Sequence, residues 1–222
     1  QLSEESKNGI EVLDEDAPVG NENPLGYLAL DDEILDVGLT PNRNDCMAAW
    51  SMALETGAIL HKEVNIPYVE GASNVGEASR LIVRSETEKC PLFLGKVINS
   101  VTIKPSPKWM QELLMAAGMK SINNVVDISN IVMLETGQPL HFYDLDAIPA
   151  QEITVKDQQR FDYTALDGES YHIEEDDIVI TTEGKPIGIA GIMGGDDSKI
   201  EETTKGIIIE AAIFHHVSDR KS

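Results

Sequence analysis

A carboxylate interrupts a strongly apolar run near the end of the chain. Glu210 follows three isoleucines at residues 207–209 and precedes Ala-Ala-Ile-Phe at residues 211–214. An isolated buried charge costs several kcal/mol, so this side chain must point outward, find a partner or sit in a lined pocket. On an edge strand it would simply face solvent. In a pocket it would be a strong hydrogen-bond acceptor in apolar surroundings, which suits recognition of a phenolic hydroxyl.

His141 follows a sharp helix stop. Val125 and Ile128 belong to an apolar pattern at helical spacing, which Gly137 and Pro139 end, because glycine adopts the left-handed conformation of a helix end and proline cannot continue the helix. The sequence therefore predicts that His141 lies in an extended segment beside a helix end. A single histidine is more often a packed or surface residue than a functional one, so its surroundings must decide its role.

A glycine-rich segment, Gly-Ile-Met-Gly-Gly, lies at residues 191–195 directly after an apolar run. Glycines permit left-handed backbone and a close approach of main-chain N–H groups to a ligand. A tight turn between two strands would use the same residues. The segment alone leaves both interpretations open.

The chain contains no motif of covalent or metal-dependent catalysis. It lacks a GxxxxGK[ST] phosphate loop, a GxSxG elbow, an HExxH pair and a spaced set of Cys and His ligands. We therefore expect no metal site.

Acidic residues dominate the charge. The 222 residues include 39 Asp and Glu against 17 Lys and Arg, which gives a formal net charge of −22. Phosphate binding needs clustered Lys and Arg, so this composition disfavours an independent nucleic-acid-binding domain. The acidic surplus is expected to be solvated surface, or a face for a basic neighbouring subunit.

The cysteine pattern and the hydropathy indicate a cellular setting. Cys46 and Cys90 are far apart and form no CxxC pair, and the sequence has no signal peptide and no apolar run of membrane-spanning length. We expect a reduced cytoplasmic protein with no membrane segment.

Three parts of the chain would position these residues. Residues 1–24 are acidic with few bulky apolar positions, and we expect the tail of a preceding module there. Residues 25–80 are expected to form a small α+β module, and residues 81–222 a larger module.

The small module is predicted to contain one strand and one helix. Alternating apolar residues predict a strand near residues 34–39, and Asn44 or Asp45 is expected to cap a helix that ends near Leu60. Residues 67–78 are expected to be a linker.

The larger module is predicted to combine helices with period-two strands. The predicted helices begin at Ser106-Pro107 and at Asn123, and Asp167-Gly168 and Glu183-Gly184 are expected to form hairpin turns. The predicted strands are residues 81–85, 92–98, 153–155, 161–166, 170–173, 178–182, 185–190 and 207–214. Strands and helices are partly segregated, so we expect the α+β class, with mixed and antiparallel sheets and flanking helices.

Three blocks in the same order resemble the beta subunit of bacterial phenylalanyl-tRNA synthetase. They are LTPNRNDC at residues 39–46, KSINNVVDISNIVMLETGQPLHFYDLD at residues 120–146, and AGIMGG at residues 190–195 with Ile209-Glu210-Ala211. The resemblance covers nearly the whole chain. It implies a fragment that runs from the tail of an inserted tRNA-binding-like module, through a second module, into the central editing module.

This resemblance implies proofreading of tyrosine mischarged onto tRNA(Phe). An apolar synthetic site rejects an added hydroxyl by only about 10²-fold, so a second site must hydrolyse the wrong ester. By similarity, Glu210 would accept the tyrosine hydroxyl and His141 would orient a water or the ribose. The main-chain N–H near Gly194 would meet the developing negative charge, and Lys120 would hold the terminal adenosine or a phosphate.

The resemblance also implies partners and cofactors. The partners would be the acceptor end of tRNA(Phe) and the alpha subunit of a heterotetramer. ATP and Mg would serve only the whole synthetase, and the editing reaction would need no cofactor.

The chain departs from the family at Lys120, where arginine is usual, and at Phe142, where a small residue is usual, so we expect an altered pocket. Further pocket residues of the family would follow Ser222, and an incomplete site is therefore expected. The alternative is a non-catalytic architectural or protein-interaction module of the same subunit. In that case His141 and Glu210 would be buried away from any cleft.

Overall fold

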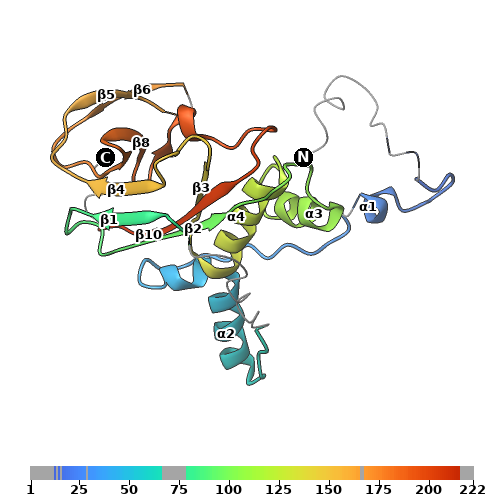
Figure 1. Cartoon of the computed structure of the whole chain (residues 1–222). Helices are drawn as coiled ribbons and strands as arrows, with labels where there is room; N and C mark the ends of the chain where they lie inside the picture. The colour runs from blue at the N-terminus through green and yellow to red at the C-terminus, as the bar shows by residue number, and fades with distance from the viewer. Residues whose placement is uncertain are drawn as a thin grey trace.

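The computed structural model describes residues 13, 15, 17–28, 30–66, 79–165 and 168–215. It confirms the predicted α+β class: a β-rich body carries helices on one side (Figure 1). The predicted linker at residues 67–78 and most of the predicted tail at residues 1–24 lie outside the described residues. Within the described ranges, no helix has the length and apolar character needed to cross a membrane.

The N-terminal part contains short helices. α1 spans Pro24–Tyr27, a 3-10 turn spans Asn44–Met47, and α2 spans Ala49–Leu60. The strand predicted at residues 34–39 is wrong: this segment has no regular structure, and its apolar side chains are exposed. An alternating pattern forms a strand only where a neighbouring strand completes its hydrogen bonds.

The predicted cap of α2 is also wrong. Ala48 precedes the helix without a side-chain cap. The Asp45 carboxylate instead accepts two hydrogen bonds from Arg43, each at 3.1 Å, and Arg43 also donates to Glu55 at 2.9 Å. The Asp45 side chain thus pairs with the guanidinium of Arg43 and does not cap α2.

The strands of the described residues form three sheets. The five-stranded sheet has the order β1-β4-β7-β8-β9, the three-stranded sheet has the order β2-β10-β3, and β5 pairs with β6. β1 and β4 are parallel, and the remaining pairs are antiparallel. The bounds are β1 Ile82–Ser85, β2 Leu92–Ile98, β3 His141–Asp144, β4 Glu152–Lys156, β5 Phe161–Thr164, β6 Ser170–Ile173, β7 Val179–Thr182, β8 Lys185–Ile189, β9 Met193–Gly194 and β10 Ile207–Ile213.

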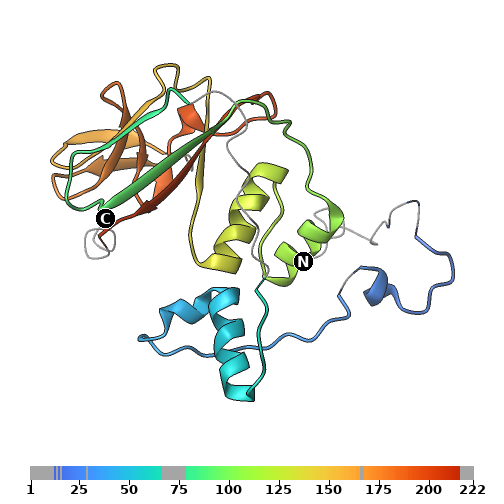
Figure 2. The same cartoon turned by 60° about the horizontal axis from the view of Figure 1, so that its bottom comes forward.

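Apolar side chains hold these sheets in layers. Ile153 and Ile180 of the five-stranded sheet belong to one buried cluster with Tyr143 and Ile208 of the three-stranded sheet. A second cluster joins the five-stranded sheet to the β5–β6 ribbon. The other face of the three-stranded sheet packs on α4 through Phe142 and Ile207. Figure 2 shows α4 between the β-rich body and α2.

α4 spans Asn124–Thr136 and follows the predicted cap and stop. The Asn123 side chain accepts hydrogen bonds from the N–H groups of Val125 and Val126, and Gly137 ends the helix in the left-handed conformation with φ 78°. α3 spans Lys108–Ala116 and packs against α4. The direction of α4 matters because β3 follows it directly and begins with His141.

A buried carboxylate fixes the start of α4. Asp127 has no exposed surface and accepts hydrogen bonds from the hydroxyls of Ser106 and Ser121, each at 2.5 Å, and from the N–H of Ile122 at 2.9 Å. These bonds tie the segments before α3 and α4 to the first turn of α4. The carboxylate also lies where the helix dipole is positive, which favours its negative charge.

Candidate ligand pocket

A pocket of about 380 Å³ opens between the three-stranded and five-stranded sheets. This volume lies within the roughly 300–1,000 Å³ typical of small-molecule sites. Most of its lining is apolar. It is lined by Pro139, Leu140, His141, Tyr143, Ile180, Gly188, Ile189, Gly191, Ile192, Met193, Gly194, Glu210, Ala212 and Phe214.

Three of the four site residues predicted from the sequence line this one pocket: His141, Gly194 and Glu210. His141 begins β3 and lies directly opposite Glu210 of β10 in the antiparallel register. Directly opposed residues of an antiparallel pair project to the same face. Gly194 reaches the pocket from the other sheet, through β9.

The carboxylate of Glu210 is buried, with 6% of the residue exposed. Its Oε2 accepts a hydrogen bond from the hydroxyl of Tyr143, which has no exposed surface. Burial raises the pKa of Glu210 from 4.5 to about 7, and the hydrogen bond from Tyr143 acts in the opposite direction. The position predicted to be either a surface group or a pocket acceptor is therefore a pocket group.

His141 is neutral at physiological pH. Burial lowers its pKa from 6.5 to about 4, because the imidazolium form would lose its hydration. Its ring packs edge-on against the ring of Tyr143, with centroids 4.5 Å apart and an interplanar angle of 75°. A neutral imidazole offers one donor and one acceptor nitrogen, so it can hold a water molecule or a hydroxyl.

The glycine-rich segment contains the turn that the sequence predicted as one of two interpretations, and it brings main chain close to His141; binding of a ligand by its N–H groups stays a prediction. Gly191 has φ 71° and makes the turn from β8 to β9. Gly194 instead gives space: a Cβ built on it would lie 2.7 Å from Nε2 of His141. The absent side chain therefore lets the β9 backbone approach the imidazole.

Lys120 is not brought to this pocket. It is exposed, it is not a lining residue, and it precedes α4 whereas His141 follows α4. Phe142 is 8% exposed and packs on Val125 and Ile207 on the other face of the sheet. The expectation that Phe142 alters the pocket directly is wrong, because neighbouring residues of a strand point to opposite faces.

Tyr143 is a pocket residue that was not predicted from the sequence. Its hydroxyl bonds Glu210 and its ring contacts His141, so it touches both polar groups of the pocket. A signal existed: Tyr143 lies two residues beyond His141 in a segment expected to be extended, which puts both on one face. Within the part of the chain that the structure describes, no group of three or more His, Cys, Asp or Glu is arranged to hold a metal ion.

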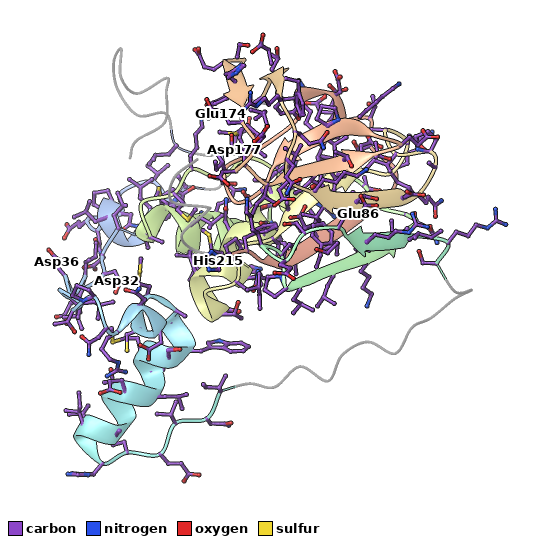
Figure 3. The ribbon with its side chains drawn as sticks, turned by 90° about the vertical axis from the view of Figure 1, so that its left-hand side faces the viewer. Asp32, Asp36, Glu86, Glu174, Asp177 and His215 are labelled. Atoms are coloured by element: carbon purple, nitrogen blue, oxygen red, sulfur yellow. The ribbon has the colours of Figure 1, made fainter. Side chains whose placement is uncertain are left out.

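Acidic side chains are spread over the molecule. Asp32 and Asp36 lie on the N-terminal segment, whereas Glu86, Glu174 and Asp177 lie on the β-rich body (Figure 3). The charge is thus not concentrated at the pocket.

Comparison with known proteins supports the family that the sequence resembles. Residues 89–222 match the model of the B3/4 domain family. The chain is 41% identical over 223 residues to the phenylalanine–tRNA ligase beta subunit of Streptococcus pneumoniae serotype 4, and 42% identical over 224 residues to that of Bacillus subtilis strain 168. Each alignment covers 100% of this chain and 28% of the relative.

A solved structure is also similar. It is an N-terminal fragment of the phenylalanyl-tRNA synthetase beta subunit from Pyrococcus horikoshii, with 13% identity and a TM-score of 0.45 over 77% of this chain and 52% of the fragment. The family match covers more than half of the chain, so the protein belongs to the B3/4 domain family and is homologous to part of the bacterial phenylalanine–tRNA ligase beta subunit.

Proposed function

We propose that this pocket proofreads the product of a phenylalanyl-tRNA synthetase by hydrolysing tyrosine from mischarged tRNA(Phe). The observation that carries the proposal is the Glu210 carboxylate, which is 6% exposed in a largely apolar pocket and directly opposite His141. A buried acceptor in apolar surroundings fits an aromatic ring with one hydroxyl. The relatives whose names include the ligase support the substrate class.

Selection for tyrosine follows from the cost of an unsatisfied acceptor. A bound tyrosine side chain would donate its hydroxyl proton to Glu210, whereas phenylalanine would displace water without offering a donor. A buried polar group left without a partner costs about 1–3 kcal/mol, or more when charged. The pocket would thus select for the additional oxygen, opposite to the selection that an apolar synthetic site makes.

The reaction is hydrolysis of an activated ester. The oxygen of a water molecule attacks the tyrosyl carbonyl carbon, the bond from that carbon to the ribose oxygen breaks, and the ribose hydroxyl regains a proton. Neutral His141 would orient the water or the ribose, and the main-chain N–H near Gly194 would meet the developing negative charge. Lys120 would hold the terminal adenosine or a phosphate once the tRNA is bound. No cofactor enters this reaction.

Other parts of the full-length protein complete the assembly. The chain spans about 28% of the length of its bacterial relatives and has a net charge of −22, so most of the grip on tRNA(Phe) would come from elsewhere. We infer that the protein works with an alpha subunit in a cytoplasmic heterotetramer. ATP and Mg would serve the synthetic reaction of that assembly.

The test is release of tyrosine from preformed Tyr-tRNA(Phe) by the full-length subunit assembled with its partner. The proposal predicts faster release from Tyr-tRNA(Phe) than from Phe-tRNA(Phe), and a loss of roughly 10²-fold or more for His141→Ala. His172→Ala is the matched control, because His172 is exposed and its ring bonds Asp162 on the neighbouring strand, away from the pocket. Equal rates with both tRNAs would support the architectural alternative.

A further inference from the structure

The buried hydroxyl of Tyr143 has a defined partner. Tyr143 has no exposed surface, and its O–H donates to Oε2 of Glu210. A buried tyrosine hydroxyl needs such a partner. Burial and the negative charge of Glu210 raise the pKa of Tyr143 well above its ordinary value. The phenol therefore remains a proton donor throughout the physiological range.

This bond makes the two oxygens of the Glu210 carboxylate different, because it engages only one of them. Oε2 is engaged by Tyr143, and among the described residues no other hydrogen bond reaches the side chain of Glu210. Glu210 still lines the pocket. Its second oxygen is consequently the atom that a ligand hydroxyl can reach.

Few other polar groups surround this pair. His141 faces Glu210 from β3, and Tyr163 of β5 adds to the rise in the pKa of Tyr143. Cys90 precedes β2, and burial, together with the charge of Glu210, raises the pKa of its thiol. The side of the pocket formed by β8 and β9 contributes Gly188, Ile189, Met193 and Gly194, none of which titrates. Tyr143 thus stands out as the neutral donor that holds the carboxylate.

We propose that Tyr143 is a specificity-determining residue, which orients the Glu210 carboxylate so that one oxygen is held and the other accepts the hydroxyl of the ligand. The inference rests on the proposed function and deepens it. Tyr143 acts through Glu210, so it is a positioning residue for recognition and takes no part in breaking the ester.

The test uses Tyr143→Phe, which keeps the ring and removes only the donor. In the full-length assembled protein, the ratio of kcat/KM for Tyr-tRNA(Phe) to that for Phe-tRNA(Phe) should fall roughly tenfold, the size expected when a hydrogen bond to a charged group is lost. A general loss of folded protein would lower both rates equally and leave the ratio unchanged. Tyr171→Phe is the matched control, since Tyr171 lies on β6 and packs in the ribbon cluster.

Two further readouts separate positioning from simple packing. Tyr143→Phe should have no additional effect on the ratio in a Glu210→Gln background, because its action needs the carboxylate. The pH at which discrimination appears should rise, since the lost hydrogen bond had favoured the ionised form of Glu210.

The outcomes distinguish this inference from the function on which it rests. If the unsubstituted protein discriminates and Tyr143→Phe discriminates equally well, the role of Tyr143 is wrong and the proposed function stands. An additional loss in the double variant would likewise overturn the role of Tyr143. If the unsubstituted protein shows no preference for Tyr-tRNA(Phe), the proposed function fails first.

Discussion

The imidazole of His141 fills the space beside Gly194 so closely that a Cβ on this glycine would lie 2.7 Å from Nε2 of His141. The two residues belong to different sheets, β3 of the three-stranded sheet and β9 of the five-stranded sheet. Both residues line the pocket. Their contact makes the position of the histidine depend on a main-chain segment distant from it in sequence.

Gly194→Ala should therefore displace the imidazole. We expect a loss of at least tenfold in tyrosine release and a cost of about 1–3 kcal/mol in the free energy of unfolding, as for other overpacked sites. Deacylation assays and urea unfolding measure the two effects. Gly38→Ala is the control, because a Cβ on Gly38 meets nothing within 4 Å. Equal activity of both variants would show that the contact is not needed.

Tyrosine recognition should depend on pH through Glu210. Its pKa is about 7, so the carboxylate becomes ionised, and a stronger acceptor, as the pH rises through 7. Preference for tyrosine over phenylalanine should increase between pH 6 and 8, as measured by the ratio of deacylation rates. His141, with a pKa of about 4, should add no transition in this range. A flat ratio would mean that the ionised form of Glu210 has no part in recognition.

The free energy of unfolding should also depend on pH through Glu210. Because folding raises the pKa of Glu210 from 4.5 to about 7, the folded state holds the proton more tightly, and this stabilisation is complete below pH 4.5 and lost as the pH rises to 7. Glutamine cannot lose this proton, so Glu210→Gln should not show this loss. Between pH 4.5 and 7 the free energy of unfolding of the variant should therefore rise by about 3 kcal/mol relative to that of the parent. Urea unfolding at several pH values provides the comparison, and parallel pH profiles would contradict it.

His141 should make the free energy of unfolding depend on pH with the opposite sign to Glu210. Folding lowers its pKa from 6.5 to about 4, so its contribution is present above pH 6.5 and lost as the pH falls to 4. A His141→Asn variant should therefore lose less stability on acidification than the parent. The same unfolding experiments measure it.

Removing the Asp127 carboxylate should destabilise the helix that leads into His141. Asp127→Ala would leave the hydroxyls of Ser106 and Ser121 and the N–H of Ile122 without their buried acceptor. We expect a loss of at least about 2 kcal/mol in the free energy of unfolding, since each orphaned buried group costs about 1–3 kcal/mol. Asp36→Ala, at an exposed position, is the control and should change stability little. Equal stabilities would refute the role of this cluster.

Helix ends, hairpins and single strands could be predicted from the sequence, because each depends mainly on neighbouring residues. The Asn123 cap and the Gly137 stop of α4, the β5–β6 and β7–β8 pairs and the strand around Glu210 are all confirmed. The strand at residues 34–39 failed because an alternating pattern says nothing about the presence of a neighbouring strand.

The composition of the pocket could not be predicted from the spacing of residues in the sequence. Residue periodicity can place His141 and Tyr143 on one face, but the register that puts His141 opposite Glu210 depends on pairing between strands far apart in the chain. The pairing of Glu210 with Tyr143 also needed the structure, because a carboxylate in an apolar run is compatible with several partners. Lys120 does not line the pocket, and its contact with the terminal adenosine or a phosphate stays a prediction.

Recognition of tyrosine by Glu210 is tested most directly by the preference of Glu210→Gln for tyrosine over phenylalanine. The full-length assembled protein and this variant would be given Tyr-tRNA(Phe) and Phe-tRNA(Phe), and the four deacylation rates compared. If Glu210 recognises the tyrosine hydroxyl, the parent prefers Tyr-tRNA(Phe) and the variant loses at least roughly tenfold of this preference, because an amide is a weaker acceptor than a carboxylate. A variant that keeps the full preference of the parent would contradict the recognition of tyrosine by Glu210.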